Sequence, residues 1–96
     1  MKHLALVSVL AATLTAAEAQ PRISAQSLTC GQARALVRAH GAVVLNTGPV
    51  TYERFVASSA FCERGEMTEP AWARTADATQ CFIAYRCVDA NLEVDR

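Results

Sequence analysis

Histidine and acidic side chains are the residues of this chain that could perform acid–base chemistry. The sequence holds two histidines, His3 and His40, and only His40 lies beyond the apolar N-terminal segment. A hydrolase relying on general acid–base catalysis would therefore use His40 with one acidic residue. The candidate acids of the second half are Glu63, Glu66, Glu69 and Asp77. Their irregular spacing matches neither a calcium loop nor the carboxylate pair of a glycosidase. Solvated turn charges and a capping role for His40 at a helix end are the simpler interpretation.

Four cysteines offer a second kind of chemistry: Cys30, Cys62, Cys81 and Cys87. Zinc sites usually contain ligand pairs roughly two to four residues apart, and thioredoxin-like sites contain Cys-x-x-Cys. Neither pattern occurs here, so we predict no metal and no other cofactor. An even cysteine count in a small exported chain instead predicts two structural disulfides.

Strand geometry limits how these cysteines can pair. Residues 80–88 have the pattern of a strand, in which the ends of six extended steps lie roughly 20 Å apart. Disulfide partners need Cα atoms within about 7 Å of each other, so Cys81 should not pair with Cys87. Their even separation places both on the same face of that strand. Two pairings remain open: Cys30–Cys81 with Cys62–Cys87, or Cys30–Cys87 with Cys62–Cys81.

The aromatic and arginine side chains are the better candidates for a contact surface. Aromatic residues are plentiful for a domain of this size, and several lie near arginines in the sequence. Core packing accounts for most of them, but Tyr, Trp and Arg dominate binding energies where they are exposed together. Trp72 follows a proline in an expected edge strand and should be partly exposed. The candidate binding patch is Trp72, Arg74 and Tyr85.

The N-terminus predicts export. A short basic head is followed by an uncharged apolar run and by Ala17-Glu18-Ala19, which resembles a signal-peptidase site. We expect a signal peptide over residues 1–19, whose apolar run is shorter than the roughly 20 residues of a membrane-spanning helix. A lipid anchor would require a cysteine immediately after the cleavage point, whereas the first cysteine is Cys30, and no later segment is apolar enough to span a membrane. The mature protein should be periplasmic or secreted.

Charge and size restrict what the mature chain can do. The 96 residues carry nine Lys and Arg against nine Asp and Glu, and cleavage removes one charge of each sign. A balanced charge argues against nucleic acid as a partner, because phosphate binding usually needs a basic excess. About 77 residues remain, a size at which the core alone gives a thin margin of stability and disulfides are expected.

The middle of the chain predicts a helix preceded by an exposed leader over residues 20–28. Thr29 and Gln32 have the spacing of a capping box, and apolar residues then recur at three- and four-residue intervals. Gly41 follows as a C-terminal cap. These features place a helix over residues 30–40.

Strand patterns alternate with turns over the remaining residues. Residues 42–45 are apolar and β-branched, typical of a strand covered on both faces, and residues 46–49 form a turn. Residues 50–57 fit either a strand or a helix; we favour the helix, because Thr51 can cap it. Residues 70–74 and 81–87 predict a hairpin with an edge strand that contains Pro70. The expected fold over residues 29–96 is a single α+β domain, with one or two helices on a small, mainly antiparallel sheet.

The order of several segments resembles a group of uncharacterised small exported four-cysteine proteins of α-proteobacteria. The similarity lies in Cys30 at the head of a helix and in residues 43–49 (VVLNTGP), 51–56 (TYERFV), 70–72 (PAW) and 81–87 (CFIAYRC). It implies a bacterial periplasmic setting and no particular mechanism. The lack of a catalytic pattern and the supply of aromatic and arginine residues lead us to expect a non-enzymatic module that binds another envelope or extracellular protein, or another envelope component, through that surface. The alternative is a small hydrolase of an envelope or extracellular polymer that uses His40 and an acidic residue.

Overall fold

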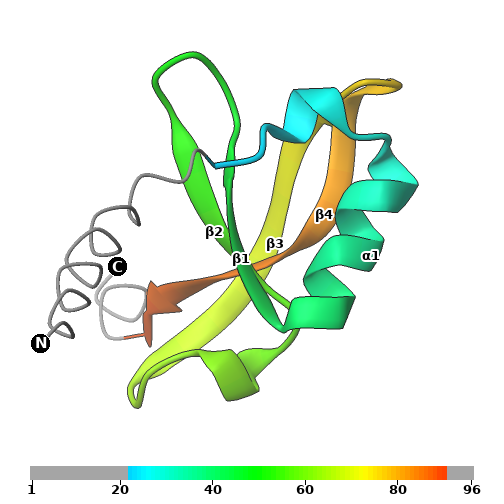
Figure 1. The fold of residues 1–96 in the computed structure, drawn as a ribbon. Coiled ribbons are helices and arrows are strands. Elements are labelled where there is room, and N and C mark those ends of the chain that lie inside the picture. Colours follow the sequence, from blue (N-terminus) through cyan, green and yellow to red (C-terminus); the bar gives the residue numbers. More distant parts are fainter. Residues whose placement is uncertain (1–21, 91–96) are drawn as a thin grey trace, which may run out of the picture.

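The computed structural model describes residues 22–90, so the expected signal peptide and the last residues of the tail lie outside the described part. The elements follow the order of a 3-10 turn η2 (Ala25–Ser27), a helix α1 (Cys30–His40), two strands β1 (Ala42–Asn46) and β2 (Tyr52–Val56), a second 3-10 turn η3 (Ser59–Phe61), and two long strands β3 (Glu66–Thr75) and β4 (Ala78–Asp89). The four strands form one antiparallel sheet in the order β1-β2-β4-β3, with α1 packed against it (Figure 1). The predicted class, a small disulfide-stapled α+β domain, is confirmed.

The helix α1 has the boundaries that its capping residues predict. The Thr29 hydroxyl accepts a hydrogen bond from the Gln32 backbone N–H at 3.0 Å, and the Gln32 side chain accepts one from the Thr29 N–H at 2.9 Å. At the other end Gly41 has a φ of 84°, a left-handed conformation that suits glycine, and its N–H donates to the Val37 carbonyl. Local chemistry therefore decides both ends of this helix.

The segment after the first turn is a strand, and the helix expected over residues 50–57 is wrong. Its residues Tyr52–Val56 pair with β1 along their whole length, with Phe55 opposite Val43 and Glu53 opposite Leu45. Pairing supplies hydrogen bonds to the backbone of β1, which would otherwise lack a neighbour, and this tertiary contact outweighs a weak local helix preference. The expectation that both faces of β1 are covered is also wrong, because the side chain of Val44 on one face is exposed.

The predicted hairpin of residues 70–87 is confirmed and is longer than expected. The strand β3 lies at the edge of the sheet, and Pro70 pairs with Tyr85. Ala71 pairs with Ala84 whereas Trp72 pairs with Phe82, so Ile83 is an extra residue in β4 and forms a bulge. Both Ile83 and Ala84 are buried.

This bulge changes which face of the sheet the later residues of β4 occupy. Before it, Cys81 belongs to the core beneath α1; after it, Tyr85 pairs with Val56, which is buried outside that core. Side chains alternate along a strand, so Cys87 shares the face of Tyr85. The expectation that Cys81 and Cys87 share a face is therefore wrong. We call the face opposite α1, which carries Val56, Tyr85 and Cys87, the outer face.

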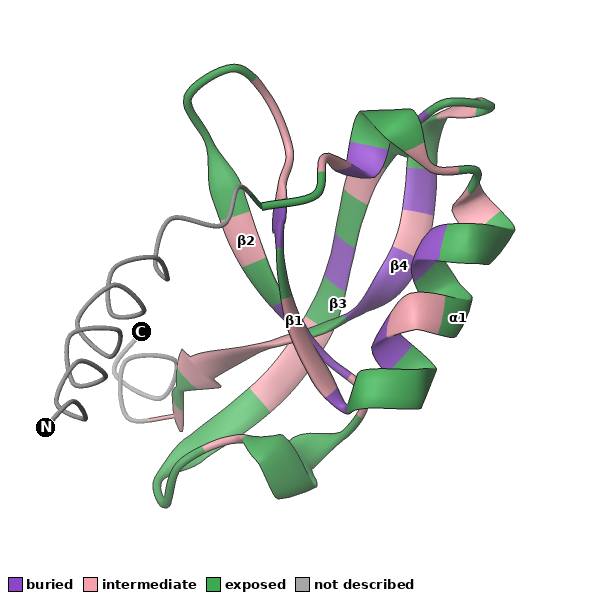
Figure 2. Ribbon diagram, in the orientation of Figure 1, coloured by how far each residue is buried: buried purple, intermediate pink, exposed green. Residues whose placement is uncertain are grey.

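The main core lies between α1 and the sheet (Figure 2). Its largest fully buried members include Phe55, Leu45 and Val37. Ala25 is also fully buried, and Asn46 donates a backbone hydrogen bond to Ile23. Residues 22–28, expected as an exposed leader, therefore pack partly against the domain, because η2 places the small Ala25 side chain in the core.

Candidate binding surface

Three aromatic side chains form a row on β3 and β4, which we call the aromatic row: Trp72, Phe82 and Tyr85. The ring of Phe82 packs edge-on against both others, with centroids 5.5 Å from Trp72 and 5.4 Å from Tyr85. Trp72 and Phe82 are cross-strand partners, and the bulge brings Tyr85 to the same side. Trp72 is 55% exposed and Tyr85 37% exposed, which confirms the predicted partial exposure of Trp72. Aromatic pairs of this kind hold rings in a fixed orientation.

An arginine from α1 completes this surface. The sheet pairs β2 with β4 only at Val56 and Tyr85, so the edge of β4 before Tyr85 has no strand beside it. Arg34 reaches across this edge. Its Nη1 donates to the Phe82 carbonyl at 3.3 Å, and its guanidinium carbon lies 5.4 Å from the centre of the Phe82 ring. The first contact satisfies an unpaired carbonyl, and the second is a cation–π interaction.

A groove of about 200 Å³ lies beside Arg34, between α1 and β4. Arg34 and Arg38 border it, one helical turn apart, together with Phe82 and Tyr85 of β4. The rest of its lining is apolar and comprises Val37, Ala57, Ile83 and Ala84. The groove therefore adjoins the aromatic row, with which it shares two residues, Phe82 and Tyr85.

The structure brings together two of the three predicted patch residues. Phe82 links Trp72 to Tyr85, but Arg74 does not line the groove. It is exposed two residues after Trp72 and borders a separate hollow at the β3–β4 turn. Sequence reasoning missed Arg34, Arg38 and Phe82. The helical periodicity placed both arginines off the apolar stripe, but no local pattern indicates which strand lies beside that flank of the helix.

Two acidic residues of the sheet, Glu53 and Glu69, share one cationic partner. Arg86 donates from Nε to Glu69 at 2.8 Å and from Nη1 to Glu53 at 3.4 Å. The hydrogen bond to Glu69 and the charges of both carboxylates raise the pKa of Arg86. In residues 22–90 no carboxylate forms an ion pair with Arg34, Arg38 or Arg74. The described part of the surface is thus cationic as well as aromatic.

The four cysteines form two disulfides, Cys30–Cys81 and Cys62–Cys87, with Cα separations of 5.7 and 5.6 Å. The exclusion of a Cys81–Cys87 bond is confirmed, and one of the two open pairings is realised. Each bridge fastens a different segment to β4: Cys30 begins α1, and Cys62 follows η3. Two disulfides are typical of proteins in an oxidising, extracellular-type environment.

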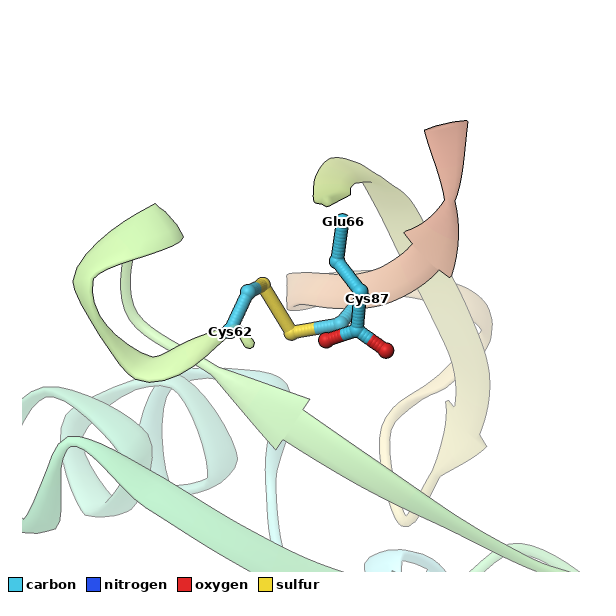
Figure 3. Close-up of side chains that lie close together, drawn as sticks. All are labelled: Cys62, Glu66 and Cys87. Atoms are coloured by element: carbon cyan, nitrogen blue, oxygen red, sulfur yellow. A yellow bond between two sulfur atoms is a disulfide. The ribbon is translucent and has the colours of Figure 1, made fainter. Parts of the chain in front are cut away.

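Cys62, Cys87 and Glu66 lie close enough to suggest a metal site, with their ligand atoms all within 4.8 Å of one another (Figure 3). Both sulfur atoms are, however, joined in the disulfide, and metal ligation by cysteine requires a free thiolate. The Glu66 carboxylate accepts a hydrogen bond from the Glu63 backbone N–H at 2.7 Å. In this oxidised form the cluster is a crosslink beside a turn-stabilising carboxylate.

The residues proposed for a hydrolase are not assembled. His40 is the last residue of α1 and is exposed. No acidic side chain within residues 22–90 hydrogen bonds to it. Glu69 bonds to Arg86, and Asp77 bonds to the Cys30 backbone.

Comparison with known proteins identifies no relative: no family model matches the chain, and no curated protein or solved structure matches it significantly. Among the described residues, no helix has the length and apolar character needed to cross a membrane.

Proposed function

We propose that this chain is an exported, non-enzymatic binding module of the bacterial envelope that recognises another protein through the aromatic row and the arginines around it. The observation that carries this proposal is the exposure of Trp72 in a row of rings held by edge-on contacts. An exposed tryptophan on a rigid strand loses little conformational entropy when a partner covers it.

The surroundings of the row support the same proposal. Arg34 lies over Phe82, and Arg74 flanks Trp72 in sequence, so aromatic area is combined with planar cations, as in binding hot spots. Both disulfides tie other segments to β4, the strand that carries two of the three rings. A scaffold stiffened in this way keeps its contact side chains in place before binding.

Export to the periplasm or beyond belongs to this proposal. It is supported by the signal-peptide pattern of residues 1–19 and by the two disulfides, which form readily in an oxidising compartment. The natural partner would then be another envelope or extracellular protein.

The test is affinity capture with the mature domain, starting from a bacterial periplasmic extract. We expect Trp72→Ala/Arg74→Ala to lose a partner that the wild-type domain retains. A matched control is Arg22→Ala/Tyr52→Ala, which removes a cation–π pair away from the row. In this pair the guanidinium carbon of Arg22 lies 4.4 Å from the centre of the exposed Tyr52 ring. The control variant should retain the partner. Equal recovery by both double variants would exclude the aromatic row as the binding site.

The single tryptophan allows a direct second measurement with the purified partner. The chain contains one Trp, so its indole emission, excited selectively over tyrosine and corrected for the emission of the partner alone, reports on Trp72. Covering the exposed indole should shift the emission to shorter wavelength and reduce quenching by acrylamide. A captured partner that leaves both signals unchanged binds elsewhere and contradicts the proposal.

A further inference from the structure

We propose that the groove between α1 and β4 binds a glutamate or aspartate side chain of the partner protein, held by Arg34 and Arg38. This inference rests on the proposed function and adds the chemistry of the partner.

The charge of the groove is uncompensated in the described part of the chain. Arg34 and Arg38 lie one turn apart on α1 and border the same groove, and neither forms an ion pair with a carboxylate of residues 22–90. Arg34 has one protein hydrogen bond, to the Phe82 carbonyl, out of five guanidinium N–H donors. Two arginines with free donors on one groove match a carboxylate, which can accept paired N–H groups.

The size of the groove favours a side chain over a separate small molecule. Its volume is about 200 Å³, below the roughly 300–1,000 Å³ of typical small-molecule sites. A single acidic side chain needs much less space and can enter while its own backbone stays outside.

The position of the groove links it to the surface proposed for binding. Phe82 and Tyr85 belong both to the aromatic row and to the groove wall. A protein that covers Trp72 therefore lies next to the groove and shields it from water. Exclusion of water strengthens the attraction between a guanidinium and a carboxylate.

The free edge of β4 favours binding of a single acidic side chain over addition of a peptide strand. A strand added at the groove would have to pair with the backbone of β4 before Tyr85, but Arg34 already occupies the Phe82 carbonyl. The arginine thus blocks backbone pairing and leaves its remaining donors for a side chain.

The experiment compares two short synthetic probes by NMR titration of the ¹⁵N-labelled mature domain. One probe is acetyl-Gly-Tyr-Glu-Tyr-Gly-amide, and the other has Gln in place of Glu. We expect the Glu probe to bind at least roughly fivefold more tightly and to shift the resonances of Arg34, Arg38 and Phe82. The variant Arg34→Gln/Arg38→Gln should remove the preference for Glu over Gln.

A charge-matched control separates a local site from general attraction. Arg22→Gln/Arg64→Gln also removes two positive charges, but from positions outside the groove. This variant should still bind the Glu probe more tightly than the Gln probe. Equal binding of both probes, or equal loss in both double variants, would overturn the inference. The same conclusion would follow if wild-type protein bound vesicles containing phosphatidylglycerol through Arg34 and Arg38 while showing no preference between the probes.

The two proposals fail in different ways. If Arg34→Gln/Arg38→Gln captures the natural partner as well as wild type does, while Trp72→Ala/Arg74→Ala does not, the acidic-groove inference is wrong and the aromatic binding surface stands. If the groove variant alone loses the partner, the groove is the recognition site and the role of Trp72 is wrong. The ¹⁵N spectrum of each variant shows whether it is folded.

Discussion

The Asp77 carboxylate accepts a hydrogen bond from the Cys30 backbone N–H at 2.8 Å, so a residue of the β3–β4 turn caps the first turn of α1. The neighbouring Ala76 donates a backbone hydrogen bond to Leu28, and Cys30 is itself joined to Cys81. Three connections thus hold the start of α1 on the hairpin. A carboxylate is also favoured there by the positive end of the helix dipole. The position of Arg34, one turn further along α1, depends on this attachment.

Removing the Asp77 carboxylate should destabilise the domain in a pH-dependent way. The hydrogen bond from Cys30, followed by that from Thr75, holds the pKa of Asp77 below its ordinary value of 3.8. A depressed pKa in the folded state means that the stabilisation is present above the unfolded-state pKa and is lost as the pH falls through the folded-state value. We expect Asp77→Ala to lower Tm at pH 7. The difference in Tm between this variant and wild type should become smaller below about pH 3.8.

The control for this measurement is Glu63→Ala, because no hydrogen bond involves the Glu63 side chain within residues 22–90. Its Tm should follow that of wild type across the same pH range. A difference between Asp77→Ala and wild type that stays constant down to about pH 2 would contradict the charged-cap interpretation.

The two disulfides should contribute unequally to stability. Cys30–Cys81 joins residues 51 apart and Cys62–Cys87 joins residues 25 apart. Loop-closure entropy alone gives about 4 kcal/mol for the first and about 3.5 kcal/mol for the second. Cys81 is also buried in the core, so Cys30→Ala/Cys81→Ala should lower the free energy of unfolding more than Cys62→Ala/Cys87→Ala. Urea titrations of the two double variants check this order, and a greater loss from the second pair would refute it.

Local sequence signals were sufficient for α1 and for the β3–β4 hairpin. The capping box of Thr29 and Gln32 and the glycine at position 41 act within a few residues, so they can be recognised without knowledge of the rest of the fold. Strand distances likewise excluded a Cys81–Cys87 bond. Selection between the two remaining pairings required the packing of α1 over the first half of β4, which no local pattern specifies.

The features that could not be predicted depend on contacts between distant segments. Residues Tyr52–Val56 are a strand because β1 pairs with them, and their own sequence fits a helix nearly as well. The bulge at Ile83 places Tyr85 beside Phe82 and moves Cys87 to the outer face. Consequently Trp72 and Tyr85 could be identified as candidates, whereas the ring that joins them and the arginine over that ring could not.

The Arg86 bridge should have a modest, salt-sensitive effect. Arg86 on β4 contacts Glu53 on β2 and Glu69 on β3, and so links strands on both of its sides. Because the Arg86 side chain is 42% exposed, solvent screens these contacts, and Arg86→Met should cost about 1 kcal/mol. The difference from wild type in urea unfolding should shrink on going to about 1 M NaCl. The control is Arg64→Met, which removes an arginine without an ion pair in residues 22–90 and should change the free energy of unfolding little. If the stability lost in Arg86→Met does not depend on salt, the loss comes from packing and not from the ion pairs.

Two glycines of the helical region should respond in opposite directions to the same substitution. Gly41 has a φ of 84°, and a Cβ atom there would lie 2.3 Å from the Phe61 ring. Gly41→Ala therefore combines backbone strain with a clash, and it should cost about 2 kcal/mol or more. Gly31 lies in the first turn of α1, where an added Cβ would meet no atom within 4 Å, so Gly31→Ala should stabilise the domain by about 0.5 kcal/mol through reduced unfolded-state entropy. Thermal unfolding of both variants tests this. Phe61 lies against Gly41 and immediately precedes Cys62. If Gly41→Ala leaves Tm unchanged, the prediction is wrong, and η3 can move away from the sheet without a loss of stability.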